Sequence, residues 1–262
     1  MTEWKAAEYS KRSQLQEAMA SEVLALIDLA GSECVLDVGC GDGKITAQIA
    51  TRVPHGTVVG VDPSRDMIAF ATSHFPRSAH SNLRFEVADA RRLSYQDEFD
   101  SVVSFNALHW IPDQDAALQS IRATMKPEAR AQLRLVPCGE RKSLEAVVEE
   151  TRRSSRWTQY FSGFDDPYLR LTPEQYASAA ERNDFRIVRI HTEPKAWDFQ
   201  SRDAFFGFCA VGLVEWTRRL PADRSAAFIN DVLARYQTLP GVLPGEENTF
   251  KFYQMDVTLT AA

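Results

Sequence analysis

The chain has 262 residues, of which 44% are hydrophobic and 25% are charged, and its formal net charge is −6 at pH 7. These values are ordinary for a soluble globular protein, and the length suits one domain with insertions or one and a half domains. The acidic balance argues against a nucleic-acid substrate, because phosphate binding usually calls for a basic face. No apolar run approaches the ~20 residues of a membrane helix. The first residues also lack an apolar signal core, so we expect a cytoplasmic protein without a membrane partner.

Residues 13–30 predict the first helix, because apolar side chains recur there at helical spacing and Gly31 supplies a stop. Strand and helix patterns then alternate from residue 33 to residue 136. Such alternation predicts a parallel sheet with helices on both of its faces. The fifth strand of this sheet is expected at 131–136, after a turn at Lys126-Pro127.

The most informative segment is 35–43, in which an apolar strand stops at a glycine-rich turn and a helix follows. The glycines of the turn, Gly39, Gly41 and Gly43, allow a tight bend and a close approach by a ligand, and the helix start offers N–H groups. Their spacing departs from the dinucleotide pattern G-x-G-x-x-G, because the third glycine comes one residue early. Asp37 precedes the turn, where it would repel a pyrophosphate and attract a cation.

S-adenosylmethionine carries an ammonium and a sulfonium and no phosphate, and this segment resembles motif I of the class I S-adenosylmethionine-dependent methyltransferases. Asp62 ends the expected strand at 57–62, about twenty residues past the glycines, where an acid commonly binds ribose hydroxyls. Nicotinamide enzymes use an acid there too. Asp89 follows the expected strand at 83–87, where the family's acid binds the adenine amino group. The resemblance implies S-adenosylmethionine as the cofactor and these residues as its site: Tyr9, Asp37, Gly39, Gly41, Gly43, Asp62, Met67, Asp89, Ala90 and Phe105.

The loop at 106–113 follows the fourth strand, where a small-molecule acceptor would meet the cofactor. Its Ala107-Leu108-His109-Trp110 stretch resembles that of the juvenile hormone acid, trans-aconitate and malonyl-carrier-protein methyltransferases, which methylate carboxylates. Residues 9–16 also resemble the start of the juvenile hormone acid enzymes, in which a glutamine and the tryptophan after strand four hold the acceptor carboxylate. The resemblance implies that Gln16 and Trp110 hold the carboxylate. His109 is the third candidate catalytic residue, and Tyr9 would cover the cofactor.

Methyl transfer from a sulfonium is an in-line displacement, in which orientation and exclusion of water supply much of the acceleration. A base is needed only where the nucleophile is protonated, and a carboxylate with a reference pKa near ~4 is already ionised at pH 7. We therefore expect O-methylation of a small carboxylic acid. Two alternatives stay open. One is a carbon or hydroxyl methyltransferase with His109 as general base, and the other is an S-adenosylmethionine-binding protein without transferase activity.

The second half of the chain predicts two helical insertions, at about 138–182 and 197–247, each followed by a strand. The resembled family places two such late strands at one sheet edge, the last antiparallel, with the helices between them as a lid or pocket wall. The expected fold is thus α/β and Rossmann-like: a seven-stranded, mostly parallel sheet with helical lid insertions. The whole chain, 1–262, forms a single domain in which 33–136 is the cofactor-binding core.

Aromatic residues crowd the first insertion. They are expected either in the apolar core or around a mostly apolar substrate pocket. They are Trp157, Tyr160, Phe161, Phe164 and Tyr168.

The four cysteines show no spacing typical of metal ligands, and isolated cysteines in such a chain are most often reduced. The acids show no cluster near the acceptor loop of the kind that metal-dependent catechol enzymes need. We therefore expect no metal, a small-molecule acceptor as the partner, and a monomer or a homodimer.

Overall fold

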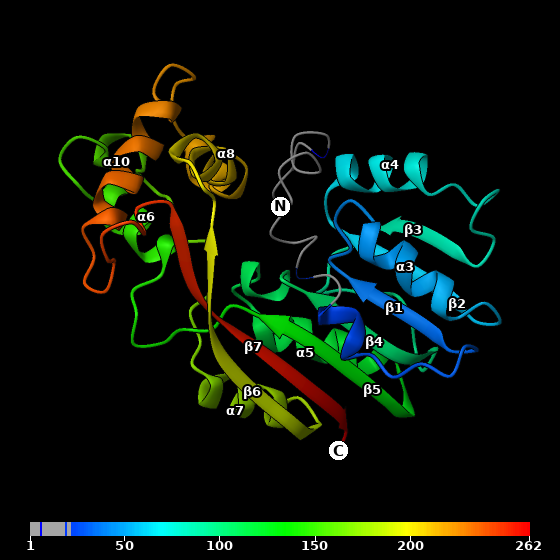
Figure 1. Cartoon of the computed structure of the whole chain (residues 1–262). Coiled ribbons are helices and arrows are strands. Elements are labelled where there is room, and N and C mark those ends of the chain that lie inside the picture. The colour runs from blue at the N-terminus through cyan, green and yellow to red at the C-terminus, as the bar shows by residue number, and fades with distance from the viewer. Residues whose placement is uncertain (1–5, 7–18, 20–21) are drawn as a thin grey trace.

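A seven-stranded sheet forms the centre of the computed structural model, which describes residue 6, residue 19 and residues 22–262 (Figure 1). The strands lie in the order β3-β2-β1-β4-β5-β7-β6. All run parallel except β7, which is antiparallel to both β5 and β6. The predicted Rossmann-like sheet with a last antiparallel strand is therefore confirmed. The strands are β1 (Cys34–Val38), β2 (Thr57–Asp62), β3 (Leu83–Val87), β4 (Phe99–Phe105), β5 (Met125–Leu135), β6 (Phe185–Asp198) and β7 (Thr249–Ala261).

The inner strands are apolar on both faces, because helices cover both sides of the sheet. Val35 and Val103 belong to one buried cluster, together with Ile49 of α3, whereas their neighbours Leu36 and Val102 belong to a second cluster on the opposite face. This alternation follows from the two-residue period of a strand. The helices of this part are α3 (Lys44–Arg52), α4 (Arg65–His74), α5 (Gln114–Thr124) and α7 (Pro173–Arg182).

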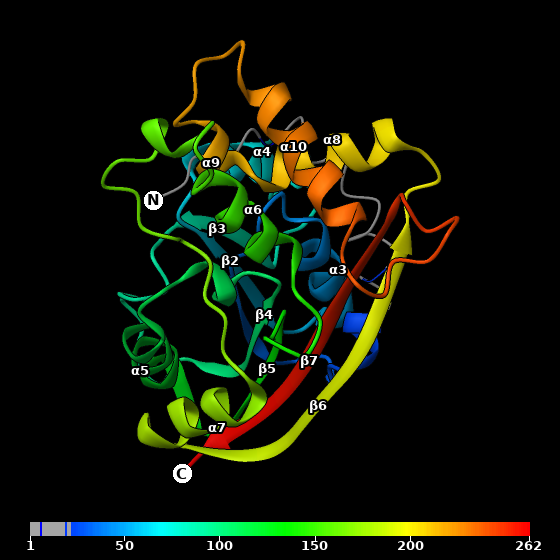
Figure 2. The same ribbon diagram turned by 90° about the vertical axis from the view of Figure 1, so that its left-hand side faces the viewer.

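A cap of four helices in the described part of the chain gathers at one end of the sheet (Figure 2). Its core is a separate aromatic cluster that includes the fully buried Trp157, Trp216 and Phe228. Phe250 and Phe252 of β7 pack into the same cluster, so this strand runs from the sheet into the cap. The cap helices are α6 (Leu144–Arg152), α8 (Arg202–Gly212), α9 (Val214–Thr217) and α10 (Ser225–Gln237).

Three helices, α5, α6 and α7, begin with side-chain caps. Asp113 accepts from the third residue beyond it at α5, and Ser143 does the same at α6. Thr172 and Gln175 form a reciprocal capping box at α7, with Pro173 in its first turn. No helix in the described part of the chain is long and apolar enough to cross a membrane.

The helix predicted over 13–30 ends earlier than expected. Its described end is helical only over residues 22–25, and Leu26 N–H closes a turn on the carbonyl of Val23 at 3.0 Å. The side chain of Glu33 then accepts hydrogen bonds from the backbone N–H groups of residues 30–32. These bonds favour a bend into β1 over a further helical turn, which the apolar periodicity alone did not reveal.

The predicted turn at Lys126-Pro127 is wrong, because β5 begins at Met125 directly after α5. The pairing between β4 and β5 steps from Phe99↔Met125 to Ser101↔Arg130, so the residues around the proline form an irregular stretch of the strand. Proline is tolerated in a strand at such an irregularity, where it need not donate to the ladder. β6 extends into the second predicted insertion at 197–247, since it pairs with β7 as far as Asp198.

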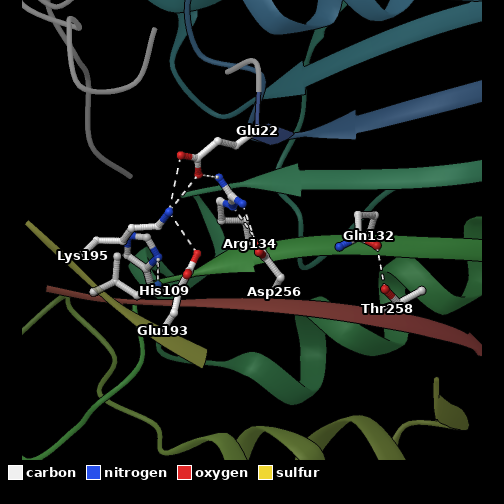
Figure 3. A network of polar contacts seen from close by, with 9 residues as sticks. Glu22, His109, Gln132, Arg134, Glu193, Lys195, Asp256 and Thr258 are labelled. Carbon is white, nitrogen blue, oxygen red and sulfur yellow. Dashed lines mark hydrogen bonds and ion pairs between the residues drawn. The ribbon is translucent and has the colours of Figure 1, made fainter. Parts of the chain in front are cut away.

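A buried arginine ties the last three strands to the chain before β1 (Figure 3). Arg134 of β5 donates from Nε and Nη2 to the carboxylate of Asp256 on β7, at 2.7 and 3.0 Å. Its Nη1 lies 3.5 Å from the carboxylate of Glu22. Lys195 of β6 pairs with Glu22 at 3.2 Å and with Glu193 at 2.9 Å. Bidentate pairing of this kind fixes geometry as well as charge.

We expect Arg134→Met to lower the free energy of unfolding by about 3 kcal/mol, because it leaves the nearly buried carboxylate of Asp256 without its partner. Urea unfolding followed by circular dichroism measures the change. Lys195→Met is the control, since its partners Glu22 and Glu193 are exposed and such pairs contribute about 1 kcal/mol or less. Equal losses in the two variants would contradict this account of Arg134.

Candidate functional site

A cavity of about 530 Å³ lies between the sheet and the cap. Part of its wall, here named the strand wall, consists of residues within 38–41, 61–67 and 88–91 and of Phe105, which lie at or just after the carboxyl ends of β1 to β4. The opposite part, here named the cap wall, comes from residues within 144–145, 163–168 and 208–219. Residues 106–112 of the loop after β4 complete the wall together with Met19, Val136, Phe250 and Phe252. Ligands of open α/β sheets bind at this edge of the strands.

The structure brings most of the predicted site residues into this wall. The residues that line it are Gly39, Gly41, Asp62, Met67, Asp89, Ala90, Phe105, His109 and Trp110. Asp37 and Gly43 do not line it. Tyr9 and Gln16 lie outside the residues that the structure describes.

The glycine-rich turn lies against the loop that follows β4. Gly39 has a φ of 81°, and a Cβ atom at this position would come within 2.2 Å of the Cβ of Ala107. The N–H groups of Gly39 and Cys40 both donate to the carbonyl of Val61, at 2.7 and 3.0 Å. Gly41, with a φ of 54°, has no atom within 4 Å of the place where its Cβ would be. The turn is therefore crowded at Gly39 and open at Gly41.

Asp62 holds the ends of β1 and β2 together. Its Oδ2 accepts from the N–H of Gly41 at 3.1 Å, and its Oδ1 accepts from the N–H of Ser64 at 2.9 Å. Ser64 in turn caps α4, the helix that carries Met67. This carboxylate thus orients the turn and lines the cavity at the same time.

Asp37 and Gly43 support the turn from outside the cavity. The buried carboxylate of Asp37 accepts a hydrogen bond from the Thr46 hydroxyl at 2.7 Å. Burial raises the pKa of Asp37 to about 7, and the charge of Asp62 acts in the same direction. A Cβ at Gly43 would lie within 2.9 Å of the side chains of Phe85 and Ala71, so only glycine fits there.

Asp89 is held by an arginine that the sequence reasoning did not single out. The Arg91 guanidinium donates to both oxygens of Asp89, with its Nη2 2.7 Å from Oδ2. These hydrogen bonds keep the pKa of the Asp89 carboxyl below its usual value. Arg91 itself also lines the cavity, so the strand wall carries one cation beside its acids.

His109 and Trp110 lie on a single short turn, η1 (Leu108–Trp110). The amide of Gln114 secures this turn by donating to the carbonyls of Leu108 and Ile111, both at 2.7 Å. The backbone N–H of Val136, just after β5, donates to Nδ1 of His109 at 3.3 Å. Figure 3 draws His109 in the same view as the Arg134 network.

The imidazole of His109 is neutral. It is buried, and burial lowers its pKa to about 3. Because Nδ1 accepts the Val136 N–H, the hydrogen-bond pattern assigns the proton of the neutral ring to Nε2. The residue is therefore a hydrogen-bond donor and a poor base at neutral pH.

Aromatic rings continue from Trp110 into the cap wall. The ring centroid of Tyr168 lies 5.0 Å from that of Trp110 and 5.0 Å from that of His109. The aromatic residues of the first insertion were expected either in the apolar core or around a pocket, and the structure places different ones in each. Phe164 and Tyr168 line the cavity, whereas Trp157 and Phe161 are buried in the cap and do not line it.

The cap wall also carries charged residues that the sequence reasoning missed. They come from separate elements of the cap, and no motif connects them along the chain. They are Glu145, Asp165, Glu215, Arg218 and Arg219. In the described part of the chain, no three His, Cys, Asp or Glu residues are grouped so that they could hold a metal ion.

We expect Gly39→Ala to destabilise the protein more than Gly41→Ala. Both variants force alanine into a left-handed conformation, which costs about 1–2 kcal/mol, but only Gly39→Ala meets a neighbour, the Cβ of Ala107. Thermal unfolding compares the two. Adding Ala107→Gly removes that neighbour and should restore part of the loss in Gly39→Ala. No interaction between the Gly39 and Ala107 substitutions in this double-mutant cycle would refute the close contact.

A family model described as a methyltransferase domain matches residues 35–128 of the chain. The trans-aconitate 2-methyltransferase of Variovorax paradoxus is 27% identical over 87% of this chain and 87% of its own length. Among solved structures, the YcgJ protein of Bacillus subtilis has a TM-score of 0.63 at 16% identity, with 94% of this chain and 98% of its own covered.

The phosphoethanolamine N-methyltransferase 2 of Haemonchus contortus, in complex with S-adenosyl-L-methionine, has a TM-score of 0.62 at 16% identity. It is matched over 98% of this chain and 57% of its own. At this identity the structural likenesses establish the fold, while the family model and the curated relative bear on the activity. With the glycine-rich turn and the acids of the strand wall, they identify the chain as a class I S-adenosylmethionine-dependent methyltransferase that resembles the trans-aconitate methyltransferases.

Proposed function

We propose that this methyltransferase transfers the methyl group of S-adenosylmethionine to a carboxylate oxygen of a small carboxylic acid. The observation that carries the proposal is the neutral, buried His109 beside Trp110 in the cavity wall. Both side chains supply N–H donors, which can bind an anion without neutralising it. The name of the relative that methylates trans-aconitate supports the same acceptor chemistry.

The strand wall fits the cofactor, which supplies an electrophilic methyl group when it is bound. In our proposal residues 33–136 form the cofactor-binding core, with Asp62 on the ribose hydroxyls, Met67 against the adenine and Asp89 on its amino group. The open space at Gly41 supports a close approach of a ligand to the backbone. The carboxylate of Asp62 also favours a cationic ligand over a pyrophosphate.

The cap would then supply the acceptor side of the site. We assign this role to the insertions at 138–182 and 197–247, which contribute the cap wall. The chain's part in the reaction is to orient the acceptor and to exclude water from it. Gln16 keeps its predicted role as a second donor to the acceptor carboxylate, and Tyr9 its predicted role over the cofactor.

The state of His109 weighs against methylation of a hydroxyl or an acidic carbon. Such acceptors must lose a proton, and a general base works best with a pKa near the working pH. A histidine whose pKa is lowered to about 3, with Nδ1 already accepting from Val136, does not meet that need. A carboxylate is ionised before it reacts, so it makes no demand for a base.

We expect Asp62→Ala to weaken S-adenosylmethionine binding at least ~10-fold, or about 1.4 kcal/mol, since it removes a charged acceptor from the strand wall. Isothermal titration calorimetry measures the effect. Asp223→Ala, at an exposed position between α9 and α10, is the control. Retained affinity in a folded Asp62→Ala protein would remove Asp62 from the cofactor site. Binding of NAD instead of S-adenosylmethionine by the unmodified protein would overturn the proposal.

We expect the rate with a carboxylic acid acceptor to be nearly flat between pH 6 and 9, because neither the acceptor nor His109 changes protonation in that range. His109→Ala should act mainly on KM. A fall in kcat of ~100-fold or more, with a rate that rises through pH 6–7, is the signature of a general base and would refute this role. Product analysis completes the test, since methyl esters are hydrolysed by alkali whereas methyl ethers and C-methyl groups are not.

A further inference from the structure

The cap wall combines an apolar surface with a few charged groups. Its apolar part includes Phe164, Tyr168, Phe208 and Leu213, and Phe250 and Phe252 of β7 continue it. A pocket of this kind contacts the body of a ligand through apolar surface and sets its orientation through a small number of polar groups. The polar groups of the cap wall therefore decide which acceptors fit.

The charges of the cap wall do not favour a polyanion. Glu145, Asp165 and Glu215 face the cavity together with Arg218 and Arg219, so the acids are at least as numerous as the cations. Arg218 forms an ion pair with the buried Glu215. The guanidinium of Arg219 lies over the ring of Phe164, 5.4 Å from its centroid. A tricarboxylate such as trans-aconitate would call for an excess of cations here, which the cap wall does not supply.

Glu145 lines the same cavity as Trp110 and His109, and one of its carboxylate oxygens is unsatisfied. It is the second residue of α6. Its Oε2 atom is buried and has no hydrogen-bond partner among the residues that the structure describes. Burial, and after it the charge of Glu145, raises the pKa values of Tyr168 and Cys209, which also line the cavity. The ring centroid of Tyr168 lies 5.0 Å from that of Trp110.

A buried carboxylate oxygen without a donor is costly unless a ligand supplies one. Glu215 also has an oxygen, Oε1, without a partner in the described part of the chain, but its other oxygen forms the ion pair with Arg218. Burial raises the pKa of Glu145, although a hydrogen bond from the Ser143 side chain and the charge of Arg170 act in the opposite direction. Hydroxyl and ammonium groups both supply the missing donor.

Resting on the proposed carboxyl methylation, we propose that Glu145 selects acceptors that carry a hydrogen-bond donor on an apolar body, away from the carboxylate that is methylated. The substrate class is then a hydroxylated or aminated monocarboxylic acid with an apolar body. In this class the carboxylate is held by His109 and Trp110, the body by the aromatic cap wall, and the donor by Oε2 of Glu145. The side chain acts as a specificity determinant through ligand contact.

Matched trios of acids test this inference. Each trio consists of an unsubstituted monocarboxylic acid and its terminally hydroxylated and aminated forms, on linear bodies of increasing length and on aryl bodies. Methyl ester formation is measured with labelled S-adenosylmethionine. For the best body, we expect kcat/KM of a substituted acid to exceed that of the unsubstituted acid at least ~10-fold, mainly through KM. We expect trans-aconitate to be the poorer acceptor by a similar factor.

Glu145→Leu should remove most of this preference, and Glu145→Gln should keep it for the hydroxylated acid but lose it for the aminated one, because the amide accepts a hydrogen bond but carries no charge. The matched control is Glu150→Leu on the same helix, which pairs with Lys142 and does not line the cavity. Affinity for S-adenosylmethionine verifies that each variant is folded.

The inference about Glu145 would be overturned, with the proposed carboxyl methylation intact, by ester formation without a preference in any trio or by a preference that survives Glu145→Leu. Preferred methylation of trans-aconitate would do the same. If S-adenosylmethionine binds but no acid of the panel is esterified, the proposed carboxyl methylation fails, and the inference about Glu145 fails with it.

Discussion

The close contact between Gly39 and Ala107 is the constraint on which the site depends. It brings the glycine-rich turn after β1 against the loop after β4, and a single methyl group on Gly39 would separate them. The turn belongs to the strand wall, and the loop carries His109 and Trp110. Because a methyl transfer needs its reacting groups within ~3 Å of each other, the approach of these two segments sets the geometry of the proposed reaction.

The network around Arg134 extends this constraint to the acceptor loop. Arg134 is held on β5 by Asp256, its carbonyl accepts the N–H of Asn106, and the N–H of Val136 reaches Nδ1 of His109. The end of β5 thus fixes both the position of the loop and the tautomer of the histidine. A buried ion pair of this kind is weak evidence for stability as such, and its clearer consequence here is a fixed orientation.

Burial changes the chemistry of groups in the cavity wall and behind it. It lowers the pKa of His109 in the wall to about 3, and it raises the pKa of Asp37, behind the glycine-rich turn, to about 7. Asp62 and Asp89 stay close to hydrogen-bond donors and remain suited to a cationic ligand. The cap wall adds aromatic surface and acids. In the proposed reaction, a site of this composition would hold the cationic cofactor at the strand wall and leave the choice of acceptor to the cap.

The sequence by itself determined the features that depend on neighbours in the chain. The alternation of apolar residues predicted the sheet and its helices, and the glycine spacing predicted the turn, because both patterns are local. Pairing and burial depend on residues far apart in sequence, so only the tertiary structure decided them. Pro127 lies within a strand because of its partner strand β4, Asp37 lies outside the cavity wall, and His109 is neutral because β5 and the cap enclose it. The acids of the cap wall come together for the same reason, since α6 and α9 meet only in the folded chain.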